Sequence, residues 1–331
     1  MVTGIHDVVR VETASSNPRI VDQYSLINTL TEYKKYYIMG GSASWRNVRS
    51  LLKNNIPDIM IKEQGDMDYP RLDVWGISDH DLFKDAHETF QKIDDGQPFF
   101  AVIQTATNHR PYSIPDDIRG FDVLDADEKV LTNAGFDSKG QYNAMRLLDH
   151  AVGEFITDAK SAPYFENTIF LFFGDHGTSD PRAIHMPRSD FDLKLRSYQV
   201  PFFIYGPSVK GGVVRSDVSQ LVDLLPTVNG LAGKTYENRT MGRDLMNDAI
   251  PLDPLALIIN KKMAKHHIAV VGQKYYLSME KDGTNMQLHE LGSDEPLVDV
   301  KAKFPEIADR YFYRLKGIYE TTKYMLYHNK K

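Results

Sequence analysis

The chain has 331 residues, and its 42% hydrophobic and 25% charged residues are ordinary for a globular protein, which excludes a disordered chain or a coiled coil. Its 39 basic and 45 acidic residues give a formal net charge of -6, which argues against a nucleic-acid-binding protein. Cysteine is absent, so disulfides, thiolate nucleophiles and iron–sulfur clusters are excluded. No apolar run approaches the ~20 residues of a membrane span, and residues 1–10 lack the apolar core of a signal peptide. We therefore expect this chain to be soluble.

Strand-like and helix-like segments alternate through the first two thirds of the chain, as in a sheet built from βαβ units. Gly40-Gly41 separates the first such strand from a helix, and a helix is indicated where apolar residues recur every three or four positions. The predicted strands cover residues 36–39, 98–105, 168–173 and 200–205, and the predicted helices cover 44–52, 142–160 and 218–231. The pattern predicts an α/β fold with a mostly parallel central sheet sandwiched by helices.

The pattern changes after Thr235. Two short strands over 268–279, joined at Gly272-Gln273, and a third over 286–291 predict a small antiparallel sheet. A closing helix is expected from about residue 305 to 327. We therefore divide the chain into an α/β core, residues 1–235, and a C-terminal part, residues 236–331.

The sharpest motif is Phe172-Phe173-Gly174-Asp175-His176-Gly177, in which a buried strand ends at two polar residues between glycines. In open α/β sheets, ligands bind beyond the carboxyl ends of the strands. Aspartate and neutral histidine are both good ligands for a divalent cation such as Zn²⁺ or Mn²⁺. The motif therefore indicates a metal site at Asp175 and His176. The alternative is an ordinary strand exit with a capping aspartate and a surface histidine.

Asn108, His109 and Arg110 follow the strand over 98–105 in the same way. An imidazole here can bind an anionic oxygen or a second ion, and a guanidinium offers a fork of donors for phosphate or sulfate. The alternative is a solvated loop. His185, nine residues beyond His176, can fold back over the same strand end, although by itself it is typical of a surface histidine. We expect His109 and His185 to share a cleft with Asp175.

Together these segments resemble the alkaline phosphatase superfamily, in its sulfatase-like branch of lipoteichoic acid synthases, phosphoglycerol transferases and phosphoethanolamine transferases. The resemblance rests on the motif at 173–177, the loop Thr107-Asn108-His109-Arg110-Pro111-Tyr112 and the later His185. Supporting matches are residues 200–207, the stretch Ser219–Thr227 with its S-x-x-D-l-x-P-T pattern, and the segments around Tyr276-Leu277 and 288–291.

The resemblance implies a metal-dependent hydrolase or transferase that acts on phosphate or sulfate esters, with lipid-linked or glycan-linked substrates both open. Asp175 and His176 would bind a divalent metal ion, whether Mn, Zn, Mg or Ca. His109 and His185 would contact the transferred group or hold a second metal, and Asn108 and Arg110 would bind substrate. The family mechanism is in-line attack by a metal-activated Thr, Ser or formylglycine. Family enzymes of this branch lie in the cell membrane with an extracytoplasmic catalytic domain.

The chain departs from the family pattern at its N-terminus. In the family, an acidic metal ligand ends a first strand and the nucleophile begins the next helix, both before the segments matched here. Neither Thr3 nor Thr13 follows such a strand. We therefore expect an N-terminally truncated domain without its nucleophile, attached to a membrane only through a missing part. It would bind metal weakly and turn over little. Alternatives are an inactive anion-binding module of this fold, and a structural protein in which Asp175 and His176 are incidental.

Overall fold

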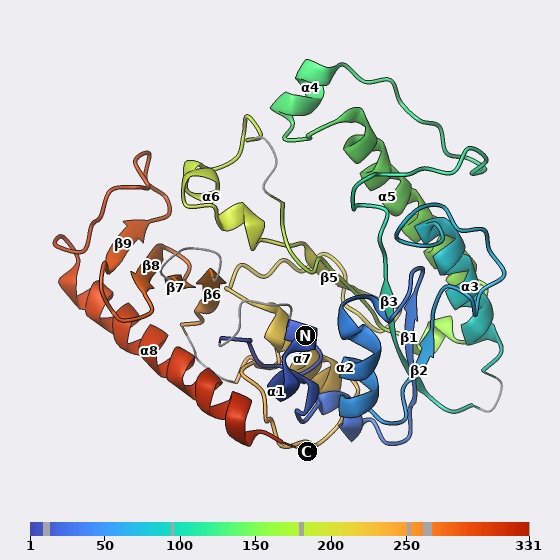
Figure 1. Ribbon diagram of the computed structural model, residues 1–331, viewed down its shortest axis with the longest axis horizontal. Coiled ribbons are helices and arrows are strands. Elements are labelled where there is room, and N and C mark those ends of the chain that lie inside the picture. Colours follow the sequence, from blue (N-terminus) through green and yellow to red (C-terminus); the bar gives the residue numbers. More distant parts are fainter. Residues whose placement is uncertain (9–13, 94–95, 179–181, 250–252, 261–266, 331) are drawn as a thin grey trace.

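The computed structural model describes residues 1–8, 14–93, 96–178, 182–249, 253–260 and 267–330. These residues form a mixed α/β fold with a three-stranded sheet, a two-stranded sheet and a four-stranded sheet. The four-stranded sheet lies on the opposite side of the molecule from the three-stranded sheet and packs beside the long C-terminal helix (Figure 1). The predicted α/β fold class is confirmed.

The three-stranded sheet is parallel, as predicted, and has the order β2-β1-β3. Its strands are β1 (Lys34–Met39), β2 (Met60–Lys62) and β3 (Phe99–Gln104). In the register, Tyr37 of β1 lies opposite Ile61 of β2 and Val102 of β3. Because successive side chains of a strand point to opposite faces, Tyr37 and Met39 join one hydrophobic cluster and Ile38 joins another.

Helices cover both faces of this sheet. Helix α2 (Val48–Asn55) packs on the Tyr37 face, while α3 (Asp79–Gln91) and α5 (Lys139–Lys160) pack on the Ile38 face. The rings of Phe83 in α3 and Phe155 in α5 stack with their centroids 5.0 Å apart. The helices thus cover both faces of the sheet, so a ligand-binding site is expected at the ends of its strands.

The helix predicted over 44–52 begins later than expected. Arg46 and Asn47 have φ angles of 47° and 62°, in the left-handed region that an α-helix excludes. Residues Trp45–Asn47 therefore form a separate short 3₁₀ turn before α2 starts at Val48. This interruption moves the Trp45 side chain off the helix and onto the surface beside the strand ends.

The second sheet is an antiparallel pair of two strands that were both predicted, β4 (Phe170–Phe173) and β5 (Phe202–Tyr205). Phe172 lies opposite Phe203, and their rings stack with centroids 4.7 Å apart. Phe155 of α5 also contacts Phe170, so one helix supports both sheets. Within the described ranges, β4 pairs with β5 and β3 pairs with β1, and neither has a second strand partner. The motif strand is thus not hydrogen-bonded into the parallel sheet.

The third sheet is antiparallel and follows chain order. Its strands are β6 (Ala256–Asn260), β7 (His267–Val271), β8 (Tyr275–Glu280) and β9 (Gln287–Glu290). The β7–β8 hairpin, strand β9 and the closing helix α8 (Pro305–His328) confirm the predictions, whereas β6 was not predicted. Tyr311, Leu315 and Leu326 of α8 are buried against this sheet. Ile5 and Ile20 join the same cluster, so the N-terminal segment packs on the C-terminal part.

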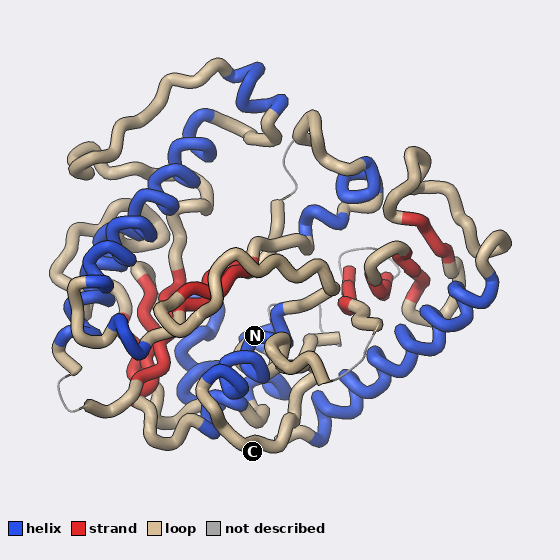
Figure 2. The backbone as a smooth tube through the Cα atoms, turned by 180° about the vertical axis from the view of Figure 1, so that it is seen from behind, coloured by secondary structure: helices blue, strands red, loops and turns tan. Residues whose placement is uncertain are grey.

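Short helices complete the fold, and the two longest helices, α5 and α8, lie on opposite sides of the molecule with the sheets between them (Figure 2). The short helices are α1 (Pro18–Val21), α4 (Glu128–Asn133), α6 (Arg188–Asp192) and α7 (Leu224–Leu231). The helix predicted over 218–231 starts with a 3₁₀ turn at Leu221–Asp223, whose capping box is formed by Gln220 and Asp223. The predicted boundary between residues 235 and 236 stays a prediction.

Candidate active site

The loop after β3 is held by one buried carboxylate. Asp79, at the first turn of α3, is 1% exposed, and its two oxygens accept hydrogen bonds of 2.8 Å from the backbone N–H groups of Ala106 and Thr107. Burial raises the pKa of Asp79, and the hydrogen bonds from Ala106 and Thr107 act against that rise. These bonds fix the start of the segment that presents Asn108, His109 and Arg110, all of which are exposed.

His109 is held against a tryptophan. The rings of His109 and Trp75 lie with their centroids 4.0 Å apart, and Trp75 Nε1 donates a 2.7 Å hydrogen bond to the Arg110 carbonyl. The Nδ1 atom of His109 lies 3.0 Å from the same carbonyl, which leaves Nε2 as the ring nitrogen that can reach a ligand. The Arg110 guanidinium pairs with Asp137. The positive charge of Arg110 is thus partly neutralised by Asp137. An anion would have to displace this carboxylate or bind to the guanidinium beside it.

Asp175 and His176 follow β4 directly and are both open to solvent, with side chains 82% and 71% exposed. His176 Nδ1 donates to the Gly177 carbonyl at 2.8 Å, which leaves Nε2 with the lone pair that a cation needs. That nitrogen is 3.8 Å from Asp175 Oδ2. Gly177 is required here, because a Cβ at this position would lie 1.8 Å from the Arg196 carbonyl oxygen. The local backbone therefore presents one oxygen and one nitrogen donor side by side.

Tyr37, on β1, lies within electrostatic range of Asp175. Burial and the negative charge of Asp175 raise the pKa of the Tyr37 hydroxyl to about 12, so it stays protonated at neutral pH. This hydroxyl donates a hydrogen bond to Oε1 of Gln104, the last residue of β3. The electrostatic influence of Asp175 therefore reaches the carboxyl end of the sheet that carries the His109 loop.

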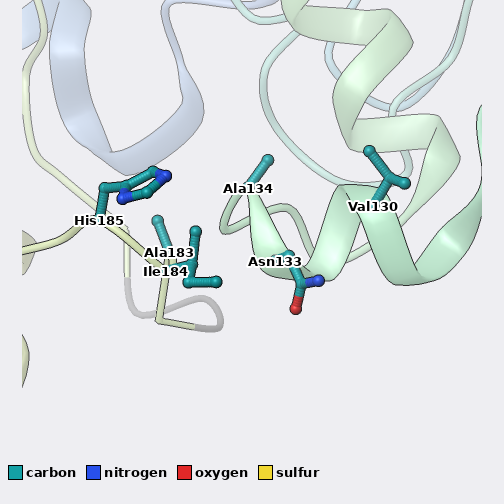
Figure 3. Close-up of a pocket in the computed structure, with 6 residues that line it drawn as sticks. All are labelled: Val130, Asn133, Ala134, Ala183, Ile184 and His185. Atoms are coloured by element: carbon teal, nitrogen blue, oxygen red, sulfur yellow. The ribbon is translucent and has the colours of Figure 1, made fainter.

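His185 lies in a different setting. It lines an open cavity of about 300 Å³ together with residues of α4, including Asn133, and with Ala183 and Ile184 of its own segment (Figure 3). The Ile184 N–H donates to the Asn133 carbonyl at 2.7 Å, which ties this segment to α4. The structure thus associates His185 with α4, and its place in a common cleft with His109 and Asp175 stays a prediction.

A second cavity, of about 410 Å³, opens at the carboxyl ends of β1 and β3. Trp45 and Trp75 form part of its wall, and neither residue was singled out from the sequence. The available signal was Gly40-Gly41 directly after a predicted strand. Gly76 has a φ of 115°, and a Cβ there would lie 1.8 Å from the Gly40 carbonyl oxygen, so the glycines let the Trp75 loop pack onto the end of β1.

The metal prediction was tested against the side chains around the motif. In the parts of the chain that the structure describes, no group of three His, Asp or Glu side chains is arranged to hold a metal ion. Asp175 and His176 provide two adjacent donors of suitable chemistry, which fits part of a coordination shell. Asp175 and His176 could therefore provide two of the ligands of a divalent cation, and a complete coordination shell would need further ligands.

The sequence and the fold were compared with known proteins. A family model described as Sulfatase matches residues 5–234. Lipoteichoic acid synthase 1 of Bacillus subtilis (strain 168) is 26% identical over 181 residues, which are 52% of this chain and 26% of that protein. The lipoteichoic acid synthase of Staphylococcus aureus (strain NCTC 8325 / PS 47) is 29% identical over 183 residues, again 52% and 26%. The matches thus span about a quarter of the length of these relatives.

Solved structures share the fold. The lipoteichoic acid synthase LtaP from Listeria monocytogenes superposes with a TM-score of 0.77 at 16% identity, over 99% of this chain and 78% of that one. A protein of the alkaline phosphatase superfamily from Vibrio parahaemolyticus gives 0.71 at 21% identity, over 97% and 74%. Among the described residues, no helix has both the length and the apolar character needed to cross a membrane. The chain shares its fold with these solved structures, one of them a protein of the alkaline phosphatase superfamily, and it belongs to the sulfatase family.

Proposed function

We propose that this chain forms the greater part of a metal-dependent catalytic domain that hydrolyses or transfers phosphate or sulfate esters. The observation that carries the proposal is the pair Asp175 and His176 at the end of β4. Their donor atoms lie 3.8 Å apart, and the Gly177 carbonyl fixes the imidazole so that Nε2 is available. The matching family model, described as Sulfatase, and the names of the relatives, which are lipoteichoic acid synthases, support ester chemistry of this class.

In this proposal Asp175 and His176 would hold the cation. A mixed oxygen and nitrogen donor set suits Zn²⁺ or Mn²⁺. When bound, the cation would neutralise the anionic group of the ester and favour attack on it. His109, braced by Trp75, would direct Nε2 at an ester oxygen, with Asn108 and Arg110 beside it.

Thr3, one of the two N-terminal threonines considered as the nucleophile, is not positioned to attack an ester. Thr3 is 5% exposed, and its hydroxyl lies 3.4 Å from the backbone N and O atoms of Ile5. Thr13 lies outside the described residues. We therefore propose that residues 1–331 alone bind metal weakly and turn over esters slowly. The second candidate function, an anion-binding module without turnover, is favoured by the burial of Thr3.

The test measures metal content and turnover on the same preparations. Protein loaded with Mn²⁺ or Zn²⁺ is analysed for bound metal, and then assayed with a chromogenic phosphodiester and a chromogenic sulfate ester. We expect Asp175→Asn and His176→Ala to lose most of the bound metal. The matched control is Asp294→Asn, which alters an exposed aspartate in the loop after β9.

The results separate the possibilities. Metal loss in both variants but not in the control, together with any metal-dependent turnover, supports the enzyme. Metal or anion binding that needs Asp175, without turnover of either ester, supports the binding module. Equal metal occupancy in the variants and the parent contradicts both. Fast turnover by the parent that Thr3→Val abolishes would show that the nucleophile lies within this chain.

A further inference from the structure

Helix α8 presents one face to solvent along its whole length. It lies on the outer side of the four-stranded sheet in both views of the molecule (Figure 1 and Figure 2). Its buried residues, which include Tyr311, Leu315 and Leu326, pack against that sheet. Because a helix repeats every 3.6 residues, the exposed residues opposite them form one stripe. We call this stripe the outer face; its members are Glu306, Asp309, Tyr313, Gly317, Glu320, Tyr324 and Tyr327.

Large aromatic side chains lie on the outer face. Tyr313 is 69% exposed and Tyr324 is 64% exposed, and the two are about three turns, or roughly 16 Å, apart along the helix. Tyr324 is held in place by the ring of His328, which stacks on it with a centroid distance of 4.2 Å. A tyrosine ring combines an apolar body with a hydroxyl that can donate a hydrogen bond, which is why tyrosine is enriched at protein interfaces.

Gly317 interrupts the outer face between these two tyrosines. Among the described residues, no atom lies within 4 Å of the position that a Cβ at Gly317 would take. Its φ angle is not in the left-handed region, so the backbone does not require glycine either. A glycine inside a helix is destabilising relative to alanine. Within the described chain nothing compensates for this cost, but a missing side chain lets the backbone of a neighbouring helix approach closely.

The charges of α8 are separated along its length. Glu306 and Asp309 are exposed in the first turns, where Arg310 is paired with Asp253 at 3.8 Å. This separation suits the dipole of the helix itself, which favours acidic side chains at the start and basic ones at the end. An antiparallel neighbour with the same sequence would bring each acidic end to a basic end. The exposed basic residues of the last turns and of the segment just after them are Lys323, His328 and Lys330.

We propose that the outer face of α8 is a contact between two copies of this chain, with their α8 helices antiparallel. In a two-fold contact each pair of residues occurs twice. Tyr313 of one copy would meet Tyr324 of the other, and Gly317 would lie near the crossing point. An anionic lipid membrane is a second kind of partner for a helix with tyrosine and lysine, but Glu306 and Asp309 would be repelled by it. The contact does not depend on the proposed function.

The size of the outer face sets the expected strength of the contact. One helix face against another buries less than the ~1,200–2,000 Å² of stable protein complexes. We therefore expect a weak dimer, with a Kd of roughly 10 to 1,000 µM. Sedimentation equilibrium of the full chain over this concentration range, in metal-free buffer, measures it.

Two variants locate the contact on the outer face. Gly317→Gln fills the gap with a good helix former, so it should weaken association about tenfold, which is about 1.4 kcal/mol. At low protein concentration it should raise the melting temperature by roughly 1 °C. Tyr324→Ser, which removes an exposed ring, should also weaken association about tenfold.

The matched control is Gly153→Gln. Gly153 is an exposed glycine inside α5, and nothing lies within 4 Å of the position of its Cβ. Its neighbours four residues away on the same face are Asp149 and Thr157, which are not aromatic. Gly153→Gln should therefore raise the melting temperature by a similar amount and associate as the parent does. Circular dichroism checks that each variant is folded.

The outcomes decide between the partners. Weaker association of Gly317→Gln and Tyr324→Ser, with no loss of melting temperature in Gly317→Gln, upholds the contact. A parent that stays monomeric over the whole range overturns it. Association that is unchanged in both variants also overturns it, because the copies then meet through another surface. A monomeric parent that binds phosphatidylglycerol vesicles, and loses this binding in Tyr324→Ser, assigns the face to a membrane and overturns the dimer. None of these outcomes involves metal binding or ester turnover.

Discussion

The loop after β3 carries predicted substrate-contacting side chains and the loop after β4 carries the two predicted metal ligands, and the two loops are held in different ways. The β3 loop is braced by the buried carboxylate of Asp79 and by the indole of Trp75. The β4 loop presents Asp175 and His176 to solvent, and its local geometry rests on backbone contacts at Gly177. The comparison teaches that the β3 half of the candidate site is anchored by a buried carboxylate, while the β4 half is held at the surface by backbone contacts.

The largest expected effect comes from removing the brace of the β3 loop. Asp79→Ala leaves the N–H groups of Ala106 and Thr107 without acceptors, and each hydrogen bond to a charged group contributes roughly 1.5 kcal/mol. We expect the free energy of unfolding to fall by about 3 kcal/mol, measured by urea denaturation. A loss below about 1 kcal/mol would show that the loop is not held by Asp79. Asp294→Ala, at an exposed position, serves as the control.

A smaller effect is expected from pH, because His80, next to Asp79 on α3, contacts two carboxylates. Its Nε2 atom lies 2.8 Å from Glu154 on α5 and its Nδ1 atom 3.7 Å from Asp81. The carboxylates of Asp81 and Glu154 raise the pKa of His80, and burial opposes them. A pKa that is raised in the folded state adds stability that is complete below the unfolded value of about 6.5 and is lost as the pH rises through the folded value.

The unfolding free energy should therefore decline, by roughly 1 kcal/mol or less, as the pH is raised above about 6.5. His80→Gln should flatten that decline. Hydrogen exchange should locate the loosening at α3 and the β3 loop, not at the β4 loop. A pH dependence that is identical in the variant and the parent would assign the effect to other groups.

The smallest expected effect on stability concerns the β4 loop. Asp175→Asn changes a side chain that is 82% exposed, so the unfolding free energy should stay within about 0.5 kcal/mol of the parent in metal-free buffer. In excess Mn²⁺ or Zn²⁺ the parent should gain stability that the variant does not, because a ligand that binds the folded state stabilises it. Thermal denaturation with and without metal measures both. A large loss without metal would place Asp175 in the structural core instead.

The elements that could be predicted from the sequence are those with a clear local pattern, either a continuous apolar run or a turn between two apolar runs. Phe170–Phe173 and Phe99–Gln104 are continuous apolar runs, and the β7–β8 hairpin has a turn at its centre. Helix α3 was not predicted, although Leu82, Phe83, Ala86 and Phe90 recur at helical spacing, and it also buries the polar residues Asp79, His80 and Asp85. Asp79 has its partners on the β3 loop, His80 on α5 and Asp85 at Lys62 of β2, and these partners are far away in the sequence.

The candidate site residues that directly follow a strand could be predicted from the sequence, whereas Trp45, Trp75 and the position of His185 could not. Asp175, His176 and the His109 loop follow strands directly, so strand prediction placed them. The pairing of β4 with β5 depends on tertiary packing that an apolar run does not encode. The Trp45–Trp75 contact depends on the positive φ angles at Arg46 and Gly76, which bring together residues 30 positions apart. His185 was placed by its nearness to His176 in the chain, which does not fix a position in space.

The division between the parallel sheet and the β4–β5 pair also bears on how the protein behaves in solution. Within the described ranges, β3 and β4 each have one edge without a strand partner, and Phe203 on β5 is 52% exposed. An aromatic strand edge with unpaired N–H and C=O groups is a template for adding another strand. At high concentration this chain should therefore associate edge to edge through its sheets, unless another polypeptide segment covers them first.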